Sequence, residues 1–147
     1  MAQQREPEQL AWALHDLAAA GAELDAAIAH RMGLTAGDYL ALKHLAVSAE
    51  PLGPVELGRM LGISSGAATG LVDRLQRAGY AHREPHQHDR RRQIVKTTAL
   101  AQHHMLRELQ PLAEDVARST AHLTPDQRRL VTDTIAELAA THRRHAR

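Results

Sequence analysis

The feature that most constrains this sequence is the stretch from Pro54 to Thr98, where two short helix-forming segments precede two short β-forming segments. Gly62 stands between the helical segments and Gly79 follows the second, which is where glycine commonly ends a helix. The β-forming segments, Tyr80–Glu84 and Arg92–Thr97, are close enough in sequence to pair as a hairpin. The stretch therefore predicts a helix-turn-helix followed by an antiparallel hairpin.

The predicted hairpin has a charged tip, His88-Asp89-Arg90-Arg91-Arg92. Pro85 cannot donate a ladder hydrogen bond, so the first strand must end there or lie at an edge. From Arg59 to Lys96 the chain has eight Lys or Arg and three Asp or Glu, a net of +5. The rest has ten basic and fourteen acidic residues, a net of −4. The overall charge of +1 thus conceals a basic patch suited to DNA phosphates.

The composition favours a mostly α-helical single domain. The 147 residues include no Phe, one Trp and two Tyr, so the core must be built from Ala, Leu and Val. The absence of Cys excludes disulfides, Cys-ligated zinc and cysteine nucleophiles. No apolar run approaches the roughly 20 residues that cross a bilayer, and the first residues are polar, unlike a signal peptide. A cytoplasmic protein without membrane contact is expected.

The central helices have distinct inward and outward faces. The third helix begins at Pro54 and has an apolar face formed by Val55, Leu57, Met60 and Leu61. Ser64 or Ser65 caps the fourth helix, whose inward residues are Ala68, Leu71, Val72, Leu75 and Ala78. Its opposite face is small and polar, with Ser65, Ala67, Thr69, Gly70, Asp73 and Arg77. Such a face can approach another molecule closely.

The flanking segments predict four further helices. The first runs from about Glu8 to about Met32, on a stripe of Leu10, Leu14, Leu17, Gly21, Leu24 and Ile28. The second is N-capped by Thr35, has Asp38 in its first turn and ends before Glu50. The fifth starts at Thr98 and should kink at Pro111; its stripe is Met105, Leu109, Leu112 and Val116. The last opens with a capping box from Thr124 to Gln127, and its stripe is Val131, Ile135, Leu138 and His142. The stripes of the terminal helices predict that these helices pair with each other and with a second subunit.

One stretch is specific enough to suggest a family. Leu71-Val-Asp-Arg-Leu-Gln-Arg-Ala-Gly-Tyr80 is followed by His82-Arg83-Glu84 and then Asp89-Arg90-Arg91. This order resembles the MarR family of winged helix-turn-helix transcription regulators, and the resemblance extends over essentially the whole chain. It implies a DNA-binding lobe at residues 35–98 and a dimerisation lobe at residues 1–34 and 99–147.

The resemblance also implies a homodimer that acts as a ligand- or stress-controlled repressor. Two departures from the family pattern concern glycine. Gly70 stands where the family often has a longer polar or basic side chain, and Gly66 and Gly70 each cost the helix roughly 1 kcal/mol relative to Ala. Ala101 replaces a glycine that the family has shortly after the capping Thr. Base readout is therefore expected to be sparse and to depend on backbone contacts and DNA shape.

The candidate DNA contacts lie on the fourth helix and the hairpin tip. We expect Arg91 to enter the minor groove, braced by an ion pair with Asp89. Arg74 and Arg77 serve either DNA phosphates or a salt bridge with Asp73, and a solvated turn is the alternative for the tip. The complete set is Ser64, Ser65, Ala67, Thr69, Gly70, Arg74, Arg77, Asp89, Arg90 and Arg91.

The resemblance places an effector pocket where the first, second and fifth helices meet the winged lobe. Trp12, His15, Tyr39 and His44 could stack on or hydrogen-bond a small aromatic or anionic molecule there. The two aromatic residues could equally well fill the core.

Three alternatives remain beside an effector-controlled regulator. The eleven histidines, including His86-x-His88 and His103-His104, lack the i, i+4 spacing of a helical zinc pair. Solvated histidines are favoured, but a metal sensor through long-range convergence stays open, as does pH-dependent binding through His82, His86 and His88. A DNA-architectural protein with little sequence preference is also compatible. An enzyme is not expected, because the sequence has neither a Gly-rich phosphate loop nor His-Glu-x-x-His, and no cofactor is predicted.

Overall fold

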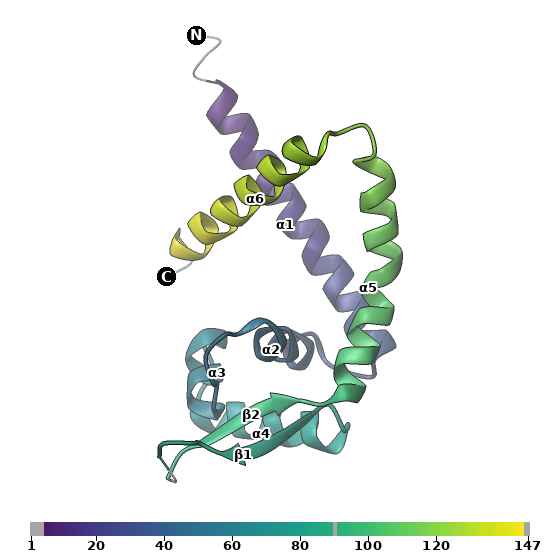
Figure 1. Ribbon diagram of the computed structural model, residues 1–147. Helices are drawn as coiled ribbons and strands as arrows, with labels where there is room; N and C mark the ends of the chain where they lie inside the picture. Colours follow the sequence, from purple (N-terminus) through teal and green to yellow (C-terminus); the bar gives the residue numbers. More distant parts are fainter. Residues whose placement is uncertain (1–4, 90, 146–147) are drawn as a thin grey trace. The chain divides into compact units, whose positions relative to one another are not determined.

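The computed structural model describes residues 5–89 and 91–145. Within them the chain forms a mostly helical fold with one two-stranded antiparallel sheet, which confirms the predicted fold class. The elements follow the order shown in Figure 1: α1 Arg5–Arg31, α2 Ala36–Val47, α3 Pro54–Leu61, α4 Ser65–Arg77, β1 Ala81–Pro85, β2 Gln93–Thr97, α5 Ala99–Ser119 and α6 Pro125–His145.

The chain divides into two compact units. The central unit runs from Ala20 to Glu108, and the terminal unit combines the segment up to Ala19 with the segment from Leu109 onward. The central unit contains the whole helix-turn-helix and the hairpin, together with the end of α1 and the start of α5. The first half of α1, the second half of α5 and α6 form the terminal unit.

Local capping explains where the central helices begin and end. Thr35 Oγ1 accepts the Asp38 amide at 3.1 Å, and Ser64 Oγ accepts the Ala67 amide at 3.2 Å, so both predicted N-caps are confirmed. Gly62 ends α3 with φ of +66°, in the left-handed region that glycine enters without a steric penalty. Gly79, with φ of +76°, follows the end of α4.

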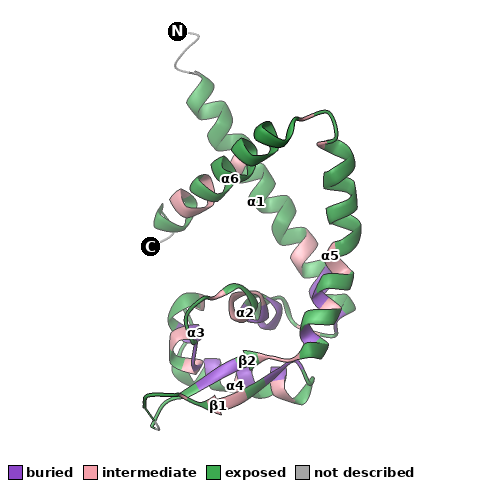
Figure 2. Cartoon of the chain, in the orientation of Figure 1, coloured by how far each residue is buried: buried purple, intermediate pink, exposed green. Residues whose placement is uncertain are grey.

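The hydrophobic core of the central unit lies between its helices and one face of the hairpin (Figure 2). Its largest fully buried side chains are Tyr39, Ile28, Leu42, Leu57, Leu75 and Val72. The inward face predicted for α4 is confirmed except for Ala78, which is exposed because the helix ends there. Val55 and Met60 are about half exposed, so the apolar face predicted for α3 is wrong for these two residues.

The hairpin, here called the wing, comprises β1, β2 and the turn between them. Its register runs from Ala81 opposite Thr97 to Pro85 opposite Gln93. Pro85 occupies the last position of β1, where the missing donor is tolerated. The Val95 amide donates to the Leu52 carbonyl at 2.7 Å, so the loop before α3 covers part of the other edge of β2.

The terminal unit buries little of its apolar surface. Within the described residues α6 has no buried side chain, and Trp12 of α1 is 73% exposed. The predicted capping box of α6 is confirmed, because the Thr124 and Gln127 side chains accept each other's backbone amides at 3.2 and 2.8 Å respectively. Helix α5 continues through Pro111. No helix in residues 5–89 and 91–145 is long and apolar enough to span a membrane.

Candidate nucleic-acid interface

The exposed face of α4 is formed by small residues. Ser65, Ala67 and Thr69 are exposed and Gly70 is half-buried, while Ala68 and Leu71 point into the core. Small side chains near a helix N-terminus leave free space beside backbone amides that carry partial positive charge. This end of α4 can therefore approach an anionic surface closely.

One flank of α4 is held by Arg83 of β1. Its Nη2 atom lies 2.7 Å from Asp73 Oδ1 and 3.5 Å from the Thr69 carbonyl oxygen, and Nη1 donates to Gln76 Oε1. Sequence reasoning did not assign Arg83 a role. Side chains alternate between the two faces of a strand, so the sequence allowed Arg83 to point toward the preceding helix. The alternation did not show that its partner is Asp73, ten residues earlier in the chain.

The opposite flank of α4 is held by Asp38 of α2. Arg74 Nε donates to Asp38 Oδ2 at 2.9 Å, and Nη2 donates to Oδ1 at 2.7 Å. The Asp38 side chain is 3% exposed and that of Arg74 is 47% exposed. The hydrogen bonds that Arg74 donates to Asp38 raise the pKa of Arg74 above its ordinary value. Of the two roles left open for Arg74, the bridge to Asp73 is wrong, because α2 brings Asp38 to Arg74 and β1 brings Arg83 to Asp73.

The other candidate cation on α4, Arg77, has no carboxylate partner among the described residues. Its Nε atom lies 3.4 Å from the Asp73 carbonyl oxygen, one helical turn earlier. The alternative in which Arg77 bridges the Asp73 side chain is therefore also wrong. Its guanidinium is exposed and available to a phosphate.

The wing tip is shaped by backbone contacts of Asp89. Asp89 Oδ1 accepts the Arg91 amide at 3.0 Å, and the Asp89 carbonyl accepts the Arg92 amide at 2.9 Å. The expected ion pair between Asp89 and the Arg91 side chain is absent from the described contacts, because the carboxylate caps the turn instead. Arg90, also a candidate contact, lies outside the described residues.

A groove of about 700 Å³ separates the wing base from α3 and α4. It is lined by Pro54, Val55, Glu56, Arg59, Thr69, Arg91, Arg92 and Gln93. Thr69 and Arg91 were expected from the sequence to contact DNA, and the structure brings both to this groove. Arg59 joins them and was not among the expected contacts, which lay on the fourth helix and the hairpin tip.

Arg92 is tied to α3 by Glu56. Glu56 Oε1 accepts from Arg92 Nη2 at 2.5 Å, and its Oε2 accepts the Gly53 amide at 3.0 Å. Partial burial raises the pKa of Glu56, but backbone hydrogen bonds and Arg92 outweigh it, so the pKa lies below its usual value.

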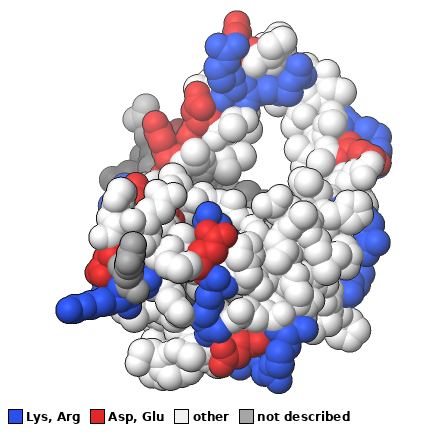
Figure 3. All heavy atoms as spheres, turned by 60° about the horizontal axis from the view of Figure 1, so that its bottom comes forward, with Lys and Arg blue, Asp and Glu red and all other residues white. Residues whose placement is uncertain are grey.

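The ion pairs show which cations are available. Arg74, Arg83, Arg92 and Lys96 pair with carboxylates, while Arg59, Arg77 and Arg91 have no carboxylate partner within residues 5–89 and 91–145. Figure 3 turns the lower end of the molecule forward, where blue and red side chains lie beside one another. The basic patch inferred from the sequence is thus partly neutralised, and the unpaired arginines concentrate on α4 and around the groove.

Comparison with known proteins relates this arrangement to a family. Residues 32–92, which contain α2 to the wing tip, match the model of the MarR family. This segment is therefore similar to MarR-family proteins. The chain is also 33% identical over 91 residues to the uncharacterized HTH-type transcriptional regulator YcgE of Bacillus subtilis (strain 168). That match covers 62% of the chain and 59% of the relative, so the chain spans less than two thirds of it.

Solved structures share the fold over most of the chain. The transcriptional regulator Tm0710 from Thermotoga maritima superposes with a TM-score of 0.69 at 22% identity, covering 94% of this chain and 96% of the other. Wild-type MarR from E. coli in its apo form gives a TM-score of 0.60 at 25% identity, covering 88% and 96%. The likeness in fold therefore extends beyond residues 32–92.

The four residues expected in an effector pocket fall in different units of the chain. Trp12 and His15 belong to the terminal unit, where their rings lie 6.1 Å apart edge to face beside a shallow hollow of about 330 Å³. Tyr39 and His44 lie in the central unit. Tyr39 is buried and its hydroxyl has no hydrogen-bond partner among the described residues. Burial, followed by the negative charge of Asp25, raises the Tyr39 pKa.

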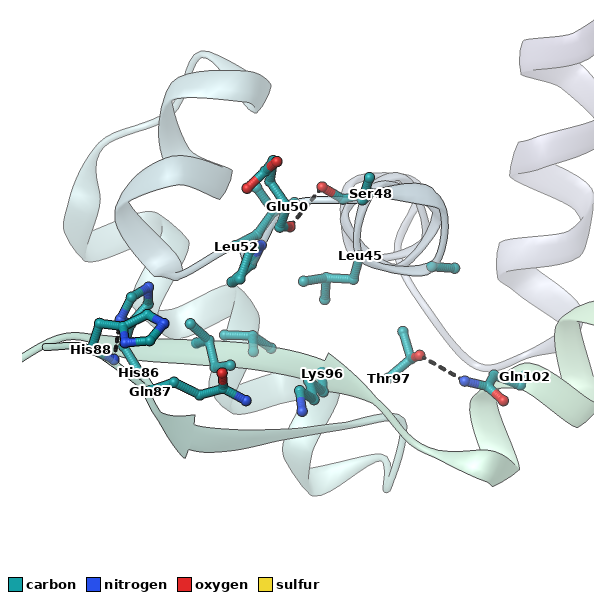
Figure 4. Close-up of a pocket in the computed structure, with 15 residues that line it drawn as sticks. Leu45, Ser48, Glu50, Leu52, His86, Gln87, His88, Lys96, Thr97 and Gln102 are labelled. Carbon is teal, nitrogen blue, oxygen red and sulfur yellow. Dashed lines mark hydrogen bonds between the residues drawn. The ribbon is translucent and has the colours of Figure 1, made fainter. Parts of the chain in front are cut away.

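A cavity of about 500 Å³ that the sequence did not predict lies between α2 and β2 (Figure 4). Leu45 and Leu52 form part of its apolar lining, and His86 and His88 stand at the wing end. The His86 Nδ1 atom accepts the His88 amide at 3.2 Å. The described residues contain no group of three His, Cys, Asp or Glu placed to hold a metal ion.

Proposed function

We propose that this MarR-family transcriptional regulator binds double-stranded DNA through α4 and the wing. The observation that carries the proposal is the groove in which Thr69 of α4 lies with Arg59, Arg91 and Arg92. A neutral hydroxyl on a helix suits a base edge, while the unpaired cations beside it suit phosphates. Arg91 at the wing tip has the reach and charge for the minor groove.

The small outward face of α4 supports close contact with the major groove. Ser65 and Thr69 are the exposed hydroxyls, and no atom lies within 4 Å of a Cβ placed at Gly66. With so few side chains to read bases, recognition depends on backbone contacts and DNA shape in addition to Thr69. Ser64, Ala67 and Gly70 contribute surface rather than hydrogen-bonding side chains, since Ser64 Oγ is occupied by its capping bond.

The proposed active species is a homodimer joined by the terminal helices. Leu10 and Leu17 of α1 and Leu130 and Ile135 of α6 are between 46% and 67% exposed. Burying exposed apolar surface of this kind in a dimer interface would stabilise the dimer by roughly 25 cal/mol for each Å² removed from water. A two-fold dimer with one α4 per subunit requires pseudo-palindromic half-sites about one helical turn, ~34 Å, apart. Residues 35–98 would serve as the DNA-binding lobe and residues 1–34 and 99–147 as the dimerisation lobe.

The regulator is proposed to act in the cytoplasm as a repressor that a small aromatic or anionic effector releases. Among the four candidate pocket residues, Tyr39 provides the strongest support, because its buried hydroxyl has no hydrogen-bond partner in the part of the chain that the structure describes. A buried polar group left unsatisfied costs about 1–3 kcal/mol, so a bound molecule that reaches it gains free energy. His44 of the same unit is proposed to line this site, and Trp12 and His15 are proposed to line the separate hollow of the terminal unit.

The deciding experiment compares binding to the promoter region of its own gene and to random duplexes of equal length. A sequence-specific regulator should prefer the promoter by at least ~10³ at physiological salt. Equal affinity for both would favour the DNA-architectural alternative, and no binding to either would refute DNA recognition. Footprints should cover two half-sites related by two-fold symmetry.

A further inference from the structure

The contact between Asp38 and Arg74 leaves part of the guanidinium unused. Asp38 takes the Nε and Nη2 hydrogens that lie on one side of the group. The two Nη1 hydrogens and the second Nη2 hydrogen remain, and together they form the end of the guanidinium fork. That end is suited to two parallel hydrogen bonds with a phosphate or with the edge of guanine.

The Arg74 guanidinium lies beside Gly70, within van der Waals contact of that position. A Cβ placed at Gly70 would meet Arg74 Nη1 at 3.8 Å, so this nitrogen lies over the glycine one turn earlier in α4. The Arg74 side chain is 47% exposed although its partner Asp38 is buried. The unused end of the fork therefore lies beside the open surface of α4.

The position of Arg74 on α4 favours a phosphate over a base. Helix geometry places Gly66, Gly70 and Arg77 along the middle of the outward stripe, and Arg74 beside it on the α2 side. In a helix lying in the major groove, the residues of the middle stripe face the bases, whereas those at the flank face the sugar-phosphate strand.

We propose that Asp38 is a positioning residue which holds Arg74 so that the free end of its guanidinium binds a DNA backbone phosphate at the flank of α4. The inference rests on the proposed DNA-binding function. Arg74 then keeps the DNA contact expected from the sequence, but through a carboxylate contributed by a different helix. The bidentate contact fixes the guanidinium plane before DNA arrives, which reduces the ordering cost of binding.

Whether Asp38→Asn weakens or tightens DNA binding distinguishes a positioning role of Asp38 from a general effect of its charge. Removing a negative charge near DNA ordinarily tightens binding, because phosphate repulsion falls. If Asp38 positions Arg74, the neutral Asn holds the guanidinium less firmly and binding weakens instead. Glu84→Gln is the matched control: it removes an exposed carboxylate that pairs with Lys96 in the same lobe, and it should leave affinity unchanged or raise it.

The experiment compares the parent protein with Asp38→Asn, Arg74→Gln and the double variant. For each protein, DNA affinity is measured as a function of salt concentration on the promoter duplex and on a random duplex. Urea unfolding measures the stability of each protein. Asp38→Asn should weaken binding about five- to ten-fold on both duplexes, and Arg74→Gln should reduce the slope of log K against log salt by about 1. In the Arg74→Gln background, Asp38→Asn should cause no further weakening. A single variant that fails to fold is replaced in the test by the double variant, which leaves no unpaired charge buried. The double variant should show the same reduction in the slope of log K against log salt as is expected for Arg74→Gln.

Several results would overturn the inference. Asp38→Asn binding as tightly as the parent or more tightly would show that Asp38 does not position a DNA contact. A loss restricted to the promoter would assign Arg74 to a base rather than a phosphate. Lower unfolding stability with unchanged affinity and salt slope would make the pair purely structural. A parent protein that binds neither duplex would instead refute the proposed function itself.

Discussion

The Nη2 atom of Arg92 lies 2.5 Å from the Oε1 atom of Glu56, which ties the end of the wing turn to the first turn of α3. The other Glu56 oxygen accepts the Gly53 amide at 3.0 Å. The backbones of Gly53 and Gln93 lie close together at this point, as shown by the 2.5 Å that would separate a Cβ at Gly53 from the Gln93 carbonyl oxygen. One carboxylate therefore sets both the start of α3 and the wall of the groove that holds Thr69 and Arg91.

Glu56→Gln should lower the free energy of unfolding by about 1 kcal/mol at neutral pH, because a charged acceptor of two hydrogen bonds becomes neutral. The folded state lowers the Glu56 pKa, so this contribution is present above the unfolded-state pKa and is lost as pH falls through the folded-state pKa. Urea unfolding at neutral and acidic pH measures both effects. Glu50→Gln, on an exposed loop residue, is the control. A difference between Glu56→Gln and the parent that grows on acidification would contradict this account.

The starts and ends of helices could be predicted from the sequence because capping is local. Ser64, Thr98 and Thr124 accept amides three residues along the chain, so residue type and spacing contain the information. The inward face of α4 was equally predictable from helical periodicity. These features fix the fold class without any knowledge of tertiary contacts.

The pairing of charges across the candidate interface could not be predicted in this way. Arg74 and Asp38 are 36 residues apart, as are Arg92 and Glu56, so the partners depend on how helices pack. The sequence offered Asp73 as a neighbour of Arg74, but adjacent residues on a helix point about 100° apart. Tertiary packing brought Arg74 and Arg92 to carboxylates on other elements.

Arg91→Ala should weaken binding to promoter and random DNA alike. The Arg91 side chain has no carboxylate partner among the described residues, so its charge is available to displace counterions whatever the sequence. The slope of log K against log salt should fall by up to about 1. Asp89→Ala should reproduce part of this loss, since it removes the cap on the Arg91 amide but also a negative charge. Unchanged affinity and slope for Arg91→Ala would mean that the wing does not touch DNA.

Thr69→Ala should act on specificity instead. The hydroxyl is neutral and lies in the groove on the exposed face of α4, where it can reach a base edge without releasing counterions. The expected loss is on the order of 1 kcal/mol or more on the promoter site and little on random DNA, with the salt slope nearly unchanged. Ser65→Ala on the same face is the comparison. A uniform loss on both duplexes would place Thr69 at the backbone.

Gly66→Ala should stabilise the protein and test how closely α4 approaches DNA. No atom lies within 4 Å of a Cβ at this helical position, so the substitution should raise the free energy of unfolding by roughly 0.5–1 kcal/mol. DNA affinity should nevertheless fall if the helix backbone contacts the duplex. Gly62→Ala, at φ of +66°, is the contrasting variant and should destabilise. Urea unfolding and a binding titration measure the two effects, and tighter DNA binding by Gly66→Ala would rule out close backbone contact.

Deleting residues 1–32, or the segment after Thr124, should abolish the soluble dimer. Either deletion removes one part of the terminal unit and leaves the apolar residues of the other parts uncovered, such as Val116 on α5.

A milder variant, Ile135→Glu, introduces a charge on the exposed apolar side of α6 and should shift the protein toward monomer while the central unit stays folded. Analytical ultracentrifugation reports the association state, and circular dichroism reports helix content. Ala136→Glu, at an exposed position of the same helix that is turned away from the stripe of Val131, Ile135 and Leu138, serves as the matched charge control. A folded monomeric deletion variant that still protects both half-sites would show that these helices are not the dimer interface.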